Sequence, residues 1–114
     1  MSPTKEYTNY VGIDIAKDTF VAAIANHKKT KSFKNTTAGI NQFISEFLDD
    51  ITHPFVVVEN TGGYERLVIK SLVNNNIAVH KAHAVLIKRF IASFGTKGKN
   101  DPIDAKHIAL YAQE

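Results

Sequence analysis

Four acidic residues stand where carboxylates could act together on a metal ion: Asp14, Glu59, Asp101 and Asp104. Asp14 lies in a stretch of alternating apolar residues where aspartate is disfavoured, so its carboxylate needs a cation or hydrogen-bond donors if it is buried. Glu59 directly follows the apolar run 55–58, which places it at the carboxyl end of a strand, where α/β sheets bind ligands. Hard divalent ions prefer such oxygen ligands, and two of them can stabilise the attacking and leaving oxygens of phosphoryl transfer.

Each of these residues also has a simpler interpretation. Asp14 could face water at a strand edge, and Glu59 could be the first polar residue after a core strand. Asp101 and Asp104 are three apart and would share one face of a helix. Aspartate is also a preferred N-cap residue, however, and acids in a first helical turn complement the helix dipole. Asp14 is the hardest to explain without a ligand, and the joint pattern favours a site.

Other chemistries find less support in the sequence. There is no cysteine, which excludes a disulfide framework, a thiolate metal site and a cysteine nucleophile. Gly62-Gly63 could let backbone N–H groups approach a phosphate or could simply form a turn, and the pair lacks the ending of a Walker A loop. The histidines have no zinc spacing, and we expect all five to be structural or solvent-facing: His27, His53, His80, His83 and His107.

The hydrophobic pattern predicts the elements that must position these residues. Strands are predicted for residues 9–16, 19–25, 31–35, 55–58 and 77–80, where apolar residues alternate or form short β-branched runs. Helices are predicted from Thr36 or Thr37 through the apolar stripe Ile40 to Leu48, for residues 64–73 and 84–94, and from Asp101-Pro102 onward. In the second helix we expect Tyr64, Leu67, Val68 and Leu72 to face inward. The order β-β-β-α-β-α-β-α-α predicts an α/β fold with a mixed sheet, in which three antiparallel strands precede alternating helices and parallel strands.

Charge and composition indicate the class of partner. The formal net charge is +3, and lysines and arginines outnumber acids between residues 66 and 106, as expected of a nucleic-acid-binding surface. Scattered solvating lysines would give the same count. The residues that we expect to contact nucleic acid are Lys17, Lys88, Arg89, Lys97 and Lys99. The chain has no signal-peptide pattern and no apolar run long enough to span a bilayer, so we expect one cytoplasmic domain over residues 1–114 with no membrane partner.

Three motifs together resemble a known family. The strings are Val11-Gly-Ile-Asp14-Ile-Ala-Lys17-Asp18, Val58-Glu59-Asn-Thr-Gly-Gly-Tyr64 and Lys99-Asn-Asp101-Pro-Ile-Asp104-Ala105. In this order they resemble the N-terminal domain of the DEDD transposases of the IS110 insertion-sequence family and the related Piv-type DNA invertases. Each motif is weak alone, whereas the ordered combination, which runs from about residue 9 to the end of the chain, is fairly specific.

The resemblance implies an RNase H-like, RuvC-like domain in which Asp14, Glu59, Asp101 and Asp104 are catalytic and bind Mg²⁺ or Mn²⁺. It implies DNA as the substrate, a homo-oligomer in the full-length protein, a structured guide RNA for some members, and a C-terminal domain with a serine nucleophile. That second domain is absent from this sequence, so we expect a fragment that is inactive alone. Three alternatives stay open: a RuvC-like junction nuclease, a non-catalytic nucleic-acid-binding module, and an actin-like or sugar-kinase ATP-binding half. The last would need phosphate-binding glycines after Asp14, where Lys17-Asp18-Thr19 stands.

Overall fold

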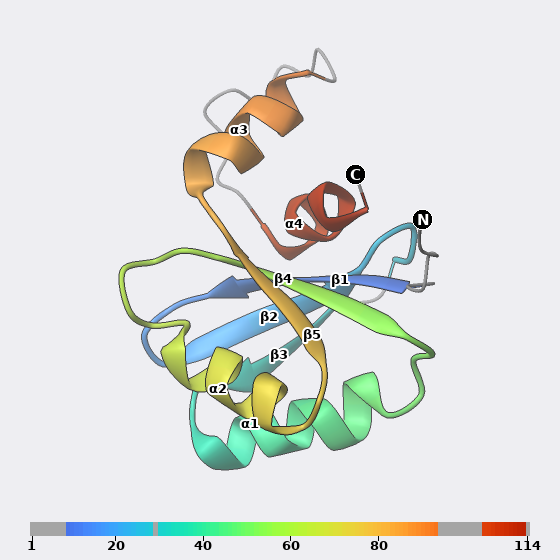
Figure 1. The fold of residues 1–114 in the computed structure, drawn as a ribbon, viewed down its shortest axis with the longest axis vertical. Helices are drawn as coiled ribbons and strands as arrows, with labels where there is room; N and C mark the ends of the chain where they lie inside the picture. Colours follow the sequence, from blue (N-terminus) through green and yellow to red (C-terminus); the bar gives the residue numbers. More distant parts are fainter. Residues whose placement is uncertain (1–8, 29, 94–103, 114) are drawn as a thin grey trace.

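The elements follow the chain in the predicted order. The computed structural model describes residues 9–28, 30–93 and 104–113 (Figure 1). The strands are β1 (Asn9–Ile15), β2 (Thr19–Ile24), β3 (Thr30–Lys34), β4 (Pro54–Glu59) and β5 (Ala78–Ala82). The helices are α1 (Thr37–Phe43), its π-helical continuation η1 (Ile44–Leu48), α2 (Arg66–Asn74), α3 (Ala84–Ala92) and α4 (Ala105–Ala112). None of the helices within these ranges has the length and apolar character needed to cross a bilayer.

The strands form one five-stranded sheet in the order β3-β2-β1-β4-β5. Strand β1 pairs antiparallel with β2, and β2 pairs antiparallel with β3. On its other edge β1 pairs parallel with β4, which pairs parallel with β5. Short turns connect the antiparallel strands, whereas the chain passes through α1 and η1 before β4 and through α2 before β5. The predicted mixed sheet is therefore confirmed, and its strand order is that of an RNase H-like fold.

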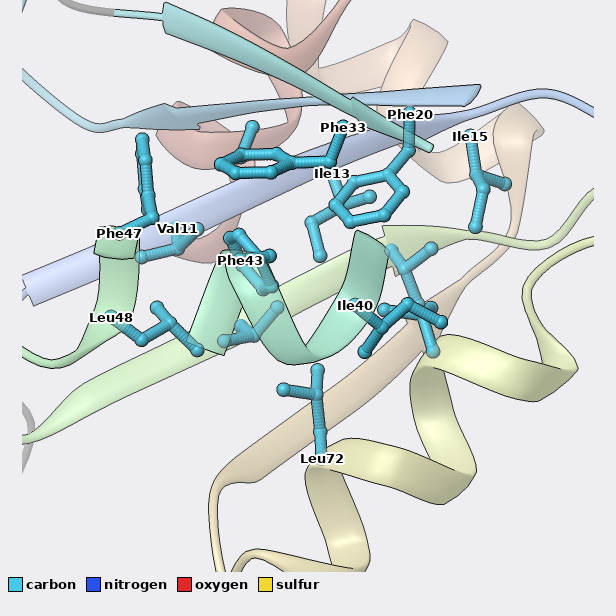
Figure 2. Close-up of a cluster of buried hydrophobic side chains, with 14 residues drawn as sticks. Val11, Ile13, Ile15, Phe20, Phe33, Ile40, Phe43, Phe47, Leu48 and Leu72 are labelled. Atoms are coloured by element: carbon cyan, nitrogen blue, oxygen red, sulfur yellow. The ribbon is translucent and has the colours of Figure 1, made fainter. Parts of the chain in front are cut away.

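One face of the sheet is covered by α1, η1 and α2 over a phenylalanine-rich core (Figure 2). Thr36 caps α1 as predicted, because its side-chain oxygen accepts a hydrogen bond from the N–H of Gly39 at 3.0 Å. The helix then presents Phe43 to the sheet, where its ring lies edge-on to that of Phe20 with 5.3 Å between the ring centroids. The alternate β1 residues Val11, Ile13 and Ile15 belong to this core, as their period-two spacing predicts.

The opposite face is covered by α4 over a smaller core, and α3 packs against α4 (Figure 1). That core joins Val57 of β4 to Ile87 of α3 and Ile108 of α4, all of them buried. Helix α4 lies directly against β1 at Gly12. A Cβ atom on Gly12 would lie 2.2 Å from the backbone nitrogen of Ala109 and 2.3 Å from the carbonyl oxygen of Ala105. The absence of a side chain at this position therefore sets how closely α4 can approach the sheet.

Two details differ from the sequence-based expectation. Helix α4 begins at Ala105, and Asp104 precedes it as the N-cap residue with extended backbone, so the prediction that Asp104 lies inside a helix already begun at Asp101 is wrong. In the α2 region Val68 and Leu72 are buried as predicted, but Tyr64 is 49% exposed and Leu67 is 36% exposed. Tyr64 stands before α2 begins, where the turn of a helix does not direct its side chain inward. The predicted end of α3 at residue 94 lies outside the described residues.

Candidate functional site

Asp14 and Glu59 lie at the carboxyl ends of two adjacent parallel strands. Ile13 of β1 is aligned with Val58 of β4, so the next residues along the two strands, Asp14 and Glu59, are neighbours across the pair. Side chains alternate between the two faces of a strand. Ile13 and Val58 belong to the phenylalanine-rich core, so Asp14 and Glu59 point to the opposite face, on which α4 packs. Both are partly buried.

Helix α4 brings Asp104 to the same edge of the sheet. The contact of α4 with Gly12 places the helix across β1, two residues before Asp14. Asp104 caps α4, because its Oδ1 accepts a hydrogen bond from the backbone N–H of His107 at 2.9 Å. The Nδ1 atom of His107 lies 3.3 Å from the same oxygen, which forms an ion pair when the ring is protonated. His107, which was expected to be structural or solvent-facing, therefore contacts one of the candidate acids.

Burial and neighbouring negative charge shift the pKa values of Asp14 and Glu59. Burial raises the pKa of Asp14 above its usual range, and the negative charge of Asp104 raises it further. Burial also raises the pKa of Glu59, to which the charge of Asp14 adds, while the ammonium group of Lys88 opposes the change. Partly buried carboxylates with raised pKa values are typical of sites that receive a cation or take part in acid–base chemistry.

Asp14, Glu59 and Asp104 are close enough for charge on one to affect another, but they do not form a complete set of metal ligands. Among the described residues, no three histidine, aspartate or glutamate side chains are grouped closely enough to hold a metal ion. Asp101, the fourth candidate, lies outside those residues, as do Lys97 and Lys99. The donor chemistry nevertheless fits a hard divalent cation, because all three described donors are carboxylates and Mg²⁺ commonly keeps several water ligands.

The described basic candidates are exposed. Lys17 lies in the turn between β1 and β2, three residues after Asp14, and both Lys88 and Arg89 lie on α3. Lys88 is close enough for its charge to lower the pKa of Glu59. A cation beside the carboxylates is suited to contact a phosphate group that approaches them.

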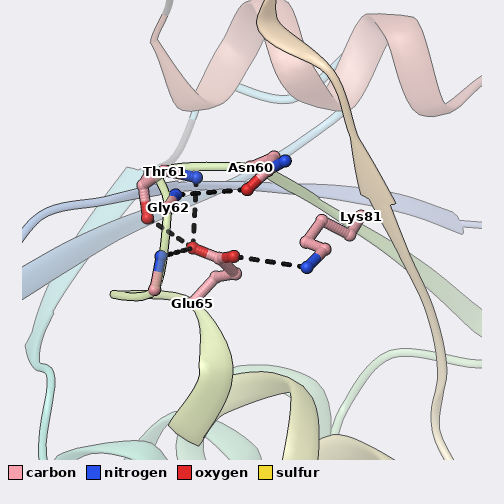
Figure 3. A network of polar contacts seen from close by, with 6 residues as sticks. Asn60, Thr61, Gly62, Glu65 and Lys81 are labelled. Carbon is pink, nitrogen blue, oxygen red and sulfur yellow. Dashed lines mark hydrogen bonds and ion pairs between the residues drawn. The ribbon is translucent and has the colours of Figure 1, made fainter.

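A buried carboxylate that the sequence analysis did not single out lies beneath the loop after Glu59 (Figure 3). Glu65 is 1% exposed, and no other charged or polar side chain among the described residues is buried. Its Oε1 atom accepts hydrogen bonds from the backbone N–H groups of Thr61, at 3.1 Å, and Gly63, at 3.2 Å, and from the hydroxyl of Thr61. The Nζ atom of Lys81 lies 3.5 Å from Oε2. Burial alone would raise the pKa of Glu65, but the hydrogen bonds from Thr61 and Gly63 lower it to about 2.

This network also decides between the two interpretations of Gly62-Gly63. Both glycines have positive φ angles, +87° and +146°, which favour glycine in the turn. The N–H of Gly62 donates to Oδ1 of Asn60, and the N–H of Gly63 donates to Glu65. Because these donors already have partners within the protein, the turn interpretation holds. The sequence signal for Glu65 was weak: an acid two residues after the glycine pair, at the start of a helix.

Comparisons with known proteins match most of the chain to a family and to a relative. The family model for IS110-type DEDD elements, described as a transposase, matches residues 11–114. The chain is also 30% identical over 110 residues to the pilin gene-inverting protein of Moraxella lacunata. The matched region covers 90% of this chain and 33% of that protein, so the chain spans about a third of the length of this relative.

Proposed function

The chain belongs to the IS110-type DEDD transposase family, and we propose that it is the metal-binding catalytic domain of a protein that cleaves and rejoins DNA strands in transposition or inversion. The observation that carries the proposal is the parallel pairing of β1 with β4, which places Asp14 beside Glu59 at the carboxyl ends of the two strands, with Asp104 close enough for its charge to act on Asp14. These acids come from separate elements, yet burial and neighbouring negative charge raise the pKa values of Asp14 and Glu59. Excess negative charge that is partly removed from water favours the binding of a cation.

Asp14, Glu59 and Asp104 would hold Mg²⁺ or Mn²⁺, with Asp101 as the fourth ligand. When bound, such an ion stabilises the negative charge that develops on the oxygens of a phosphodiester during its cleavage. The chain's own contribution is to keep the acids at adjacent strand ends, where a rigid sheet limits their movement.

The basic residues would bind the DNA backbone. Lys88 and Arg89 of α3 and Lys17 of the β1–β2 turn would contact phosphate groups near the carboxylates, and Lys97 and Lys99 would extend this surface. Contacts of this kind position a duplex without reading its sequence.

The whole protein's remaining properties follow from the family and from the part of the relative that this chain does not span. We propose a second, C-terminal domain with a serine nucleophile, a homo-oligomer on paired DNA substrates, and, in some cases, a structured guide RNA. On this proposal, residues 1–114 alone bind metal and DNA weakly and do not complete strand exchange.

Titration of Mn²⁺ into the 114-residue chain, followed by isothermal calorimetry, tests the proposal. Asp14→Asn should weaken Mn²⁺ binding about 10-fold or more, because a charged ligand is lost. Asp49→Asn is the matched control, since it removes one negative charge from an exposed position just after η1, and it should bind like the wild type. Equal Mn²⁺ binding by all three chains would refute the metal site. In that case retained DNA binding would favour a non-catalytic nucleic-acid-binding module.

A RuvC-like junction nuclease would share the metal site and differ in the reaction. A covalent serine–DNA intermediate in the full-length protein would favour the transposase. Junction cleavage without such an intermediate would favour the nuclease.

A further inference from the structure

The buried Glu65 network holds the loop that immediately follows Glu59. Strand β4 ends at Glu59, and Asn60 still pairs with β5, because its N–H donates to the carbonyl oxygen of Ala82 at 2.8 Å. The chain then leaves the sheet at Thr61. The carboxylate of Glu65 accepts hydrogen bonds from both the backbone N–H and the hydroxyl of Thr61. The position of the chain two residues after Glu59 therefore depends on a carboxylate that is itself buried.

Lys81 joins the same network to the neighbouring strand. Lys81 lies on β5, aligned with Val58 of β4, one residue before Glu59. Its ammonium group pairs with the Oε2 atom of Glu65 at 3.5 Å. Glu65 thus connects the loop after Glu59 to β5, the strand beside β4 (Figure 3).

A second set of hydrogen bonds ties this loop to the loop after Asp14. The side-chain amide of Asn35 donates to the carbonyl oxygen of Tyr64 at 3.0 Å and to that of Ala16 at 3.1 Å. Tyr64 directly precedes Glu65, and Ala16 lies two residues after Asp14. The segments that leave the two carboxylate-bearing strands are therefore linked through residues 64 and 65.

We propose that Glu65 is a positioning residue that holds Glu59 next to Asp14 for metal binding. It acts through the backbone of residues 60–63 and does not touch the ion. The inference rests on the proposed function, because it requires Asp14 and Glu59 to be ligands. A purely structural role would instead make Glu65 important for stability and irrelevant to the affinity of the site.

Two substitutions in the network and one matched control test this inference. Glu65→Gln keeps the size of the side chain but loses its charge and its pairing with Lys81, and Thr61→Val removes the hydroxyl donor. Val68→Ala is the control: Val68 is buried in α2, one turn after Glu65, and belongs to the phenylalanine-rich core, on the face of the sheet away from the Asp14 and Glu59 side chains. The three chains and the wild type would be compared by Mn²⁺ calorimetry and by amide hydrogen exchange.

We expect Glu65→Gln and Thr61→Val to weaken Mn²⁺ binding about 10-fold, as the loss of an outer support does at other metal sites, and to speed exchange of the amides of residues 60–63. Val68→Ala should lower stability without changing the affinity. If Glu65→Gln does not fold, Thr61→Val carries the test.

Two results would overturn the inference in distinguishable ways. If both network variants bind Mn²⁺ like the wild type while Asp14→Asn binds weakly, Glu65 is only structural and the proposed metal site stands. If Asp14→Asn also binds like the wild type, the metal site is absent, and the proposed function fails together with the inference.

Discussion

The packing of α4 on Gly12 should control both the stability of the fold and the affinity of the carboxylate site. In Gly12→Ala the new Cβ would lie 2.2 Å from the backbone nitrogen of Ala109, where ordinary contacts begin at 3.4 Å. Backbone atoms cannot turn aside as a flexible side chain can, so α4 must retreat by about 1 Å. Such overpacking typically costs about 1–3 kcal/mol of unfolding free energy.

The displacement of α4 carries Asp104 with it, because Asp104 is the N-cap of that helix. The distance from Asp104 to Asp14 should therefore grow, and Mn²⁺ affinity should fall about 10-fold. Urea unfolding measures the loss of stability, and Mn²⁺ calorimetry measures the loss of affinity.

Gly39→Ala is the matched control for this prediction. Its Cβ would lie 2.1 Å from the carbonyl oxygen of Lys34, a clash of similar severity with backbone on the opposite face of the sheet, where α1 packs. It should destabilise the chain and leave Mn²⁺ affinity unchanged. Equal Mn²⁺ affinities in Gly12→Ala and Gly39→Ala would refute the idea that the packing of α4 on Gly12 determines the geometry of the site.

Three further predictions concern charge. The pKa of Glu65 is lowered to about 2 from an ordinary 4.5. Its carboxylate therefore contributes up to about 3 kcal/mol to the unfolding free energy, and this contribution is fully present above pH 4.5 and is lost as the pH falls toward 2. Urea unfolding at a series of pH values should show that Glu65→Gln loses less stability on acidification than the wild type. The raised pKa of Asp14 means that its ionisation costs stability as the pH rises past its ordinary 3.8. Asp14→Asn should therefore raise the unfolding free energy of the metal-free chain at about pH 7, and an equal or lower value would count against the burial of this charge. Lys88→Met should raise the pKa of Glu59 further, because the ammonium group that opposes the increase is lost, and ¹³C NMR can follow this change. The same substitution should weaken DNA binding at low salt. Lys28→Met, a change at an exposed lysine after β2, should have neither effect.

The sequence by itself determined the order of the elements and the candidate acids. Period-two alternation in β1 and the helical spacing from Ile40 to Leu48 are local patterns, and each reports the burial of one face of one element. The cap at Thr36 was equally local, because a capping side chain bonds to an amide only three residues away. Asp14 stood out for the same reason, as an acid between apolar neighbours.

Local signals were ambiguous where two positions satisfied the same rule. Asp101 and Asp104 both fit an N-cap, and the structure assigns the cap of α4 to Asp104 through its bond to the N–H of His107. Tyr64 and Leu67 are apolar at suitable spacing, yet both are exposed, because the α2 region buries only a narrow stripe against the sheet.

Only the tertiary structure decided which acids influence one another. The pairing of β1 with β4, 45 residues apart in register at Ile13 and Val58, places Asp14 beside Glu59. The absence of a side chain at Gly12 admits α4 and brings in Asp104. Glu65 became recognisable as a buried anion only once its donors from Thr61, Gly63 and Lys81 had been brought together. The first two relations and the pairing of Glu65 with Lys81 depend on contacts between distant segments, which hydrophobic periodicity cannot encode because it records the environment of each residue and not the identity of its neighbour.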